Sequence, residues 1–317
     1  MEHQGAEIAK WRVVCGWIAV SLNLLTACLW GFWGGIEGFH EGWWHGSWWT
    51  NFLMTFAYLI PMVCFVGLGV LGVLLPRVGA VVVLLCTVWF WWWWDVPGRL
   101  AHGRMVLPGL LMSGVGGLFM MLWWFGRARP RRWALLLTVG LPVTTALVSG
   151  APMAWRVATR VDDGFAGARV VHGNGVALEW APRGPGWPIE GGWDWHEAMR
   201  VAARLSEDGT RLEADAVNSW RLPMRDEVVR SLGRHGRNAG GALDEASGHA
   251  SYEMGPDKES PLWTARSEVI YWWTADESDE SSAWSIAYNG RLLRREKGHG
   301  IGTLGFRLVR EPAGLER

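Results

Sequence analysis

The polar second half of this 317-residue chain holds the side chains best suited to bind a ligand. Tyr271 and Trp273 alternate with other apolar residues, so an extended strand places both on one face. The acidic segment 275–282 follows directly and adds Asp276 and Asp279. Carboxylates beside an aromatic platform suit a polar ligand such as a sugar. We therefore expect Tyr271, Trp273, Asp276 and Asp279 to mark the edge of a ligand-binding site.

Two alternatives stay open for these residues. Trp273 could instead pack beneath the long 233–262 loop. Clustered carboxylates can also bind calcium, but the spacing of Asp276, Glu277, Asp279 and Glu280 matches no EF-hand loop. Most acidic surface loops are simply solvated, so we expect no metal here.

Catalytic signatures are absent from the sequence. The histidines after residue 156 are scattered and form no metal-ligand spacing. All four cysteines lie in apolar runs of the first half, where a thiol is most often a small buried hydrophobic residue. No serine nucleophile elbow or phosphate-binding glycine loop is present. These observations favour a protein that is not an enzyme and that needs no cofactor.

Local signals predict helices and strands around the candidate site. A helix should run from about Trp195 to Leu205, with Asp194 as its N-cap. A second, shorter helix should follow Pro223, with acidic residues in its first turn. Arg221 is expected to pair with an acidic partner such as Glu227 or with backbone carbonyls.

Strands are expected over 175–180, 269–274, 283–288 and 304–310. Asn289-Gly290 is a strong signal for a type I′ hairpin turn, so residues 291–294 should pair back.

The order of these motifs resembles that of the Lcl C-terminal domain family. The family shows a strand ending in Trp, a helix with Trp-x-x-Ala, a Trp-Arg-Leu-Pro-Thr motif, a Tyr-Trp-Ser-Ser-Thr strand and a terminal Val-Arg. The matching residues are Trp180; Trp195 and Ala198; Trp220, Arg221, Leu222 and Pro223 with Glu227; Tyr271, Trp272 and Thr274; Ala283, Trp284 and Gly290; and Val309 with Arg310. Together they cover nearly all of residues 175–310.

The resemblance implies an α+β domain with a C-type-lectin-like fold, similar in shape to the formylglycine-generating enzyme. Such folds display loops that bind glycans or proteins. Two departures stand out: Met224 replaces the usual Thr, which removes an N-cap hydroxyl, and Trp273 replaces a small Ser. The enzyme of similar shape uses active-site cysteines, and residues 156–317 contain none.

The first half is dominated by five apolar runs at 13–33, 51–75, 79–94, 106–125 and 133–155. Most approach the roughly 20 residues that cross a bilayer as a helix. Many of the 26 tryptophans flank these runs, including Trp91–Trp94, as in the aromatic belts at membrane interfaces. We therefore expect a bundle of about five membrane-spanning helices surrounded by lipid.

Charge gives the expected orientation. Residues 1–155 carry a net charge of +4 and residues 156–317 a net charge of −4, and neither half is basic enough to indicate nucleic-acid binding. The basic cluster Arg127–Arg132 indicates a cytoplasmic loop by the positive-inside rule. Five basic residues lie on the opposite side of the membrane: Arg99, Arg104, Arg156, Arg160 and Arg169. The cytoplasmic side has seven, so the difference that sets the orientation is two residues.

The sequence thus predicts a multi-domain protein. Residues 1–155 form an all-α transmembrane anchor, 156–174 a linker or first strand, and 175–317 the lectin-like α+β domain. With five spans, that domain lies outside the cytoplasmic membrane of a bacterial cell envelope, where it would bind a glycan, an envelope polymer or a protein. The alternative is a cytoplasmic sensor domain coupled to the membrane helices, serving signalling or phage defence.

Overall fold

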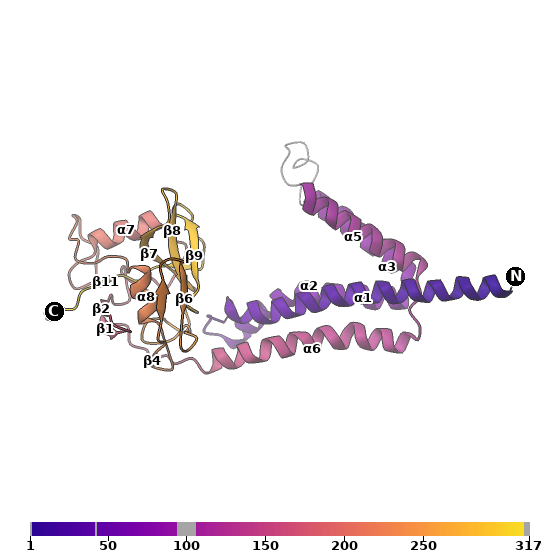
Figure 1. Ribbon diagram of the computed structural model, residues 1–317, viewed down its shortest axis with the longest axis horizontal. Coiled ribbons are helices and arrows are strands. Elements are labelled where there is room, and N and C mark those ends of the chain that lie inside the picture. The colour runs from indigo at the N-terminus through magenta and orange to yellow at the C-terminus, as the bar shows by residue number, and fades with distance from the viewer. Residues whose placement is uncertain (1, 42, 94–105, 314–317) are drawn as a thin grey trace. The chain divides into compact units, whose positions relative to one another are not determined.

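The computed structural model describes residues 2–41, 43–93 and 106–313, and the chain divides into two compact units (Figure 1). The helical unit comprises Met1–Gly42 and Phe52–Trp155, and the β-rich unit comprises Trp43–Asn51 and Arg156–Arg317. The predicted order, an apolar helical half followed by a β-rich half, is confirmed at this level.

The helices of the first half lie close to the predicted apolar runs. They are α1 (Glu2–His40), α2 (Trp48–Leu74), α3 (Pro76–Trp93), α5 (Val106–Phe125) and α6 (Arg131–Ala158). Trp94, Arg99 and Arg104, used above for the aromatic belt and the orientation, lie outside the described residues.

Within the described part of the chain, three helices are long and apolar enough to cross a membrane. These are Lys10–His40 of α1, the whole of α2 and the whole of α6, whereas Pro76–Trp89 and Gly114–Phe125 are shorter apolar stretches. The length and apolar composition of these helices indicate that the chain associates with a membrane.

Glycines on α1 allow its two neighbours in the helical unit to approach closely. A Cβ atom on Gly34 would lie 2.5 Å from the carbonyl oxygen of Tyr58 in α2, and one on Gly35 would lie 2.8 Å from that of Ala146 in α6. Both distances are too short for any side chain. Small residues at helix contacts are typical of packing inside membranes, where backbones must approach closely.

The β-rich unit contains two helices and eleven short strands within its described residues. The helices are α7 (Trp195–Arg204) and α8 (Arg225–Ser231). The strands are β1 (Arg169–His172), β2 (Ala177–Trp180), β3 (Gly233–Arg234), β4 (Arg237–Asn238), β5 (Ala242–Asp244), β6 (His249–Ser251), β7 (Tyr271–Glu277), β8 (Ser282–Ala287), β9 (Leu292–Glu296), β10 (Leu304–Gly305) and β11 (Val309–Arg310).

Two sheets form the framework of this unit. The larger has the order β10-β7-β8-β9, and the smaller has the order β1-β2-β11, while β3-β4 and β5-β6 are separate hairpins. The predicted single strand over 304–310 is wrong. Residues 304–305 pair in parallel with β7, and residues 309–310 pair with β2, so this segment connects the two sheets.

Two other local predictions can be compared directly. The α7 helix begins as expected, because the Asp194 carboxylate accepts the Glu197 N–H at 2.7 Å and the Glu197 carboxylate accepts the Asp194 N–H. The hairpin between β8 and β9 is present, but its turn is not type I′. Gly290 has positive φ and Asn289 does not, and the Ala287 N–H donates to Arg291, which encloses a three-residue loop.

Two hydrophobic cores lie on opposite faces of β7. Trp272 belongs to the first, with Leu178, Val228 and Ile286, and stacks on Trp263 at 3.7 Å between ring centroids. Trp273 belongs to the second, which is closed by α7 and by residues 304–308. The predicted alternation of faces is correct, and both indoles are structural.

The end of α6 and the segment that follows it make hydrogen bonds within the β-rich unit. Asp257 is 2% exposed and accepts hydrogen bonds from Arg156 at 2.6 Å and Arg160 at 3.1 Å, while Arg234 lies 3.7 Å away. The buried Glu259 carboxylate accepts the Val161 N–H at 2.8 Å. Residues 156–174 therefore contain the end of α6, a segment bonded to Asp257 and Glu259, and β1.

Candidate functional site

The predicted aromatic platform is not exposed. Trp273 is 0% exposed, and its indole N–H donates to the Trp193 carbonyl at 2.9 Å. The expectation that Trp273 faces solvent is therefore wrong. Alternation along the strand gave its face correctly, but α7 and residues 304–308 cover that face. Tyr271 is half-buried, and the Arg295 guanidinium lies 4.3 Å from its ring centroid.

Both predicted aspartates have structural partners. Asp276 accepts the Arg225 N–H at 2.6 Å at the start of α8 and also pairs with the Arg225 side chain at 3.2 Å. It thereby binds a free N–H at the helix start, where Met224 offers no side-chain cap. Asp279 accepts from Ser281 and pairs with Arg294.

These contacts also bear on the calcium alternative. Hydrogen bonds from Ser281, with the charge of Arg294, hold the pKa of Asp279 below its usual value. Among the described residues, no group of three or more His, Cys, Asp or Glu side chains is placed to hold a metal ion. Nor do Trp273, Asp276 and Asp279 meet at one open surface, because Trp273 is fully covered.

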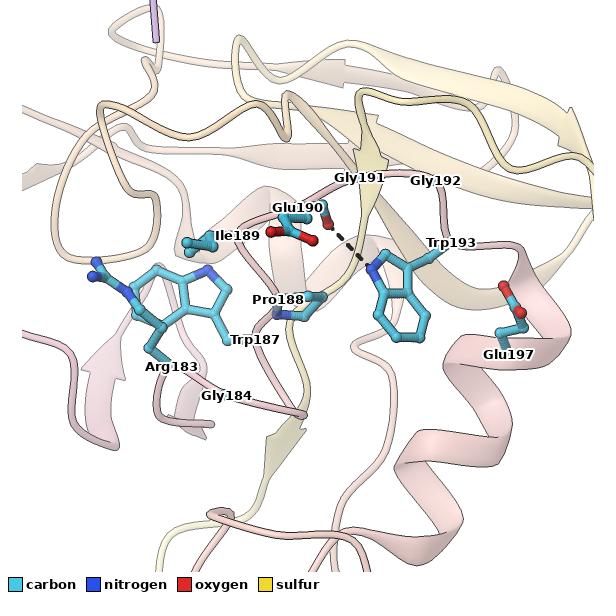
Figure 2. Close-up of a pocket in the computed structure, with 10 residues that line it drawn as sticks. All are labelled: Arg183, Gly184, Trp187, Pro188, Ile189, Glu190, Gly191, Gly192, Trp193 and Glu197. Atoms are coloured by element: carbon cyan, nitrogen blue, oxygen red, sulfur yellow. Dashed lines mark hydrogen bonds between the residues drawn. The ribbon is translucent and has the colours of Figure 1, made fainter. Parts of the chain in front are cut away.

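An open groove of the β-rich unit lies elsewhere, along the connection between β2 and α7 (Figure 2). Its volume is about 460 Å³, within the ~300–1,000 Å³ range typical of ligand sites. We call it the Trp187–Trp193 groove. Its lining residues are Arg183, Gly184, Trp187, Pro188, Ile189, Glu190, Gly191, Gly192, Trp193 and Glu197.

Backbone contacts fix this connection to the rest of the unit. The Gly192 N–H donates to the carbonyls of Ile301 and Leu304 at 2.9 and 3.0 Å. A Cβ atom on Gly191 would lie 1.7 Å from the Gly302 carbonyl oxygen, so only glycine fits there. The groove wall is thus held against the segment leading into β10, and a ligand would meet a pre-formed surface.

The floor of the groove is part of the core. Trp187 is 4% exposed, and two guanidinium groups lie near its ring, with the Arg307 carbon 3.5 Å and the Arg183 carbon 5.6 Å from the ring centroid. Arg307 is 0% exposed and donates to the carbonyls of Ala181, Pro261 and Leu262. Its Nη2 has no hydrogen-bond partner among the described residues.

Burial lowers the pKa of the Arg307 guanidinium, and the charges of Arg169 and Arg183 lower it further. A guanidinium nevertheless stays protonated in proteins. The unit therefore contains a buried cation that is held by carbonyl dipoles and by the faces of Trp180 and Trp187.

The rim of the groove is open and carries most of its charge. Ile189, 45% exposed, and Glu190 lie on the rim, and Trp193 is half-buried with its indole N–H donating to the Glu190 carbonyl at 3.1 Å. Phe306 packs edge-to-face with Trp193 at 5.3 Å between ring centroids. The groove thus combines apolar surface with carboxylates, a guanidinium and three glycines.

Sequence reasoning missed this groove. The run from Pro182 to Trp193 is rich in Gly and Pro and contains two Trp residues, which predicts an irregular connection with aromatic side chains. Such a loop on a rigid scaffold is a common place for a binding site. Comparison with known proteins gives no further guide, because no protein-family model, curated protein or solved structure matches the chain.

Proposed function

We propose that the protein is a membrane-anchored recognition protein whose β-rich unit binds a glycan, an envelope polymer or a protein. The observation that carries the proposal is the Trp187–Trp193 groove, with its pre-formed backbone and its aromatic side chains at floor and rim. The membrane-length helices α1, α2 and α6 in the same chain supply the anchor.

We further propose that the β-rich unit is a C-type-lectin-like domain related to the Lcl C-terminal domain family. The ordered motifs of the sequence support this, and the contacts of one of them fit it. Arg221 makes two hydrogen bonds of 2.7 Å to Glu227, so the Trp-Arg-Leu-Pro motif is joined to the helix that follows. This pairing was one of the two alternatives predicted for Arg221.

A binding function is favoured over catalysis. All four cysteines, Cys15, Cys28, Cys64 and Cys86, belong to the helical unit, whereas the groove residues belong to the β-rich unit. The chemistry of the formylglycine-generating enzyme needs cysteines in its active site, so we do not propose that activity. The groove side chains are instead suited to holding a ligand in place.

We propose five membrane crossings, with the β-rich unit outside the cytoplasmic membrane. The helices α3 and α5 would complete the set of spans. The alternative places the unit in the cytoplasm as a sensor coupled to the helices. A C-terminal alkaline phosphatase fusion is active only outside, and a C-terminal green fluorescent protein fusion is fluorescent only inside, so the pair separates the two topologies.

A glycan array probed with the full-length protein in detergent tests the binding function. We expect binding to a restricted set of glycans, and we expect Trp193→Ala to weaken it by about tenfold, as for an aromatic anchor. A protein that binds no glycan, no isolated envelope polymer and no envelope protein would lack the proposed function.

A further inference from the structure

Two glutamates line the groove near Trp193, and their carboxylates can accept further hydrogen bonds. Glu190 is exposed, and its carboxylate has no hydrogen-bond or ion-pair partner in the described part of the chain. Glu197 gives one oxygen to the Asp194 N–H at 3.1 Å, and its other oxygen is 3.9 Å from Arg200, beyond hydrogen-bond distance. Figure 2 shows Glu190 on the Trp187 side of Trp193 and Glu197 on its far side, so two carboxylates with unused acceptor capacity flank Trp193.

The only guanidinium among the described residues that line the groove, that of Arg183, lies at the Trp187 end. Figure 2 shows Arg183 beside Trp187, while Glu197 stands beside Trp193. Arg183 has a long contact of 3.4 Å to the Thr264 hydroxyl and lies over Trp187. Its charge is thus separated from Trp193, and the groove as a whole carries one more carboxylate than guanidinium.

We propose that the Trp187–Trp193 groove binds a saccharide that carries a free amino group. This inference rests on the proposed recognition function and specifies its ligand. The exposed part of the Trp193 ring stacks on a sugar ring, and the ammonium group lies near the unpartnered carboxylate of Glu190. Ammonium groups are attracted both to carboxylates and to indole faces.

The other ligand classes fit less well. An anionic saccharide stacked on Trp193 would be repelled by the carboxylates of Glu190 and Glu197. A neutral saccharide would leave the unpartnered Glu190 charge without a matching group. A basic peptide such as a lysine hexapeptide would match the charge but offers no ring to stack on the Trp193 indole.

Two oligosaccharides that differ only at nitrogen provide the test. The β-1,4-glucosamine hexamer carries free amino groups, and the N-acetylglucosamine hexamer has the same chain with every amine acetylated. Full-length protein in detergent is titrated with each by calorimetry, in mildly acidic buffer where the sugar amines are protonated. We expect the free amine to bind at least about tenfold more tightly and to lose affinity as salt is raised.

Rim variants then locate the contact. Glu190→Gln should weaken glucosamine hexamer binding by roughly two- to fivefold, the usual range for one exposed ion pair, and Glu190→Lys should weaken it further. Both changes lie on an exposed side chain and leave the core intact. Glu245→Gln, an exposed glutamate at the turn between β5 and β6, is the matched control and should bind like the native protein.

Three results would overturn the inference. Equal affinity for the two hexamers removes the role of the amine but leaves the glycan-binding function standing. Native affinity in both Glu190 variants would mean that the ligand does not bind in the groove. Equally tight binding of a lysine hexapeptide would mean that the site does not select a saccharide. Failure of the proposed function is a separate outcome, seen as no binding to any glycan, polymer or envelope protein.

Discussion

The Arg307 guanidinium carbon lies 3.5 Å from the centroid of the Trp187 ring, inside a unit where Arg307 has no exposed surface. The same side chain donates to the carbonyls of residues 181, 261 and 262. It therefore joins the end of β2, the segment before β7 and the segment between β10 and β11 through one planar group.

Arg307→Met should destabilise the β-rich unit by about 2–4 kcal/mol, because three carbonyl groups lose a charged donor and stay buried. Arg307→Lys should recover only part of this, since an ammonium lacks the planar fork. Urea unfolding of the full-length protein in detergent, followed by limited proteolysis, measures both. Arg291→Met, at an exposed arginine, is the control, and an equal effect there would contradict the assignment.

Trp273→Ala should destabilise the β-rich unit by about 3–5 kcal/mol, as expected for a large core truncation. Trp272→Ala should cost a similar amount, because each indole fills one of the two cores on either side of β7. Denaturant midpoints compare the two variants. A Trp273→Ala protein as stable as the native one would mean that this side chain lies at the surface after all.

Asp257→Asn should destabilise the unit by about 3–5 kcal/mol, the usual effect of removing one partner from a buried ion pair. Arg160 has only 5% of its side chain exposed and would keep a charge without a carboxylate. Glu213→Gln removes an exposed pair with Arg211 and should change stability by less than about 1 kcal/mol. Similar denaturant midpoints for the two variants would mean that the ion pairs of Asp257 do not stabilise the unit.

Stability should fall in acid, and Asp163 should contribute to this. Hydrogen bonds from the Arg169 guanidinium, the Phe165 N–H and the Ser260 hydroxyl hold the pKa of Asp163 well below its usual value. A carboxyl with a lowered folded-state pKa stabilises the fold above its unfolded pKa near ~3.9 and loses that effect as pH falls. Asp163→Asn should therefore flatten the loss of stability below about pH 5. An unchanged acid profile would remove this role.

Met224→Thr should stabilise α8 by about 0.5–1 kcal/mol, because a hydroxyl at the N-cap can accept a free N–H of the first turn. The Met224 backbone is already extended, with φ −72° and ψ 156°, as an N-cap requires. Met224→Ala removes the same side chain without adding an acceptor and is the control. Equal stability of the two variants would show that Glu227 and Asp276 already satisfy the helix start.

The sequence predicted the features that depend on near neighbours. Asp194 caps α7 because its acceptor and the helix N–H groups are three residues apart, and the Arg221–Glu227 pair spans a single turn and helix start. Apolar runs likewise marked the helices of the first half. Each of these depends on a short stretch of chain, which the sequence displays directly.

Features that depend on distant segments were predicted less well. Alternation placed Trp273 on the correct face, but only the folded chain brings α7 and residues 304–308 over it. The split of the last strand depends on two different partners, β7 and β2. The groove was missed because it forms where the 183–193 connection meets residues 301–304, more than 100 positions later.

Trp187, at the floor of the groove, is also part of the hydrophobic core, so ligand affinity and fold stability are coupled at this residue. At the rim of the groove they are separate. A ligand that touches Trp187 selects the native state and should raise the temperature of unfolding by mass action. Changes at this position would alter stability and affinity together, and few would be tolerated. Glu190 and Arg183 stand outside the packed interior, so they are free to vary. Related chains could therefore acquire new ligands through the rim alone, with the floor kept constant.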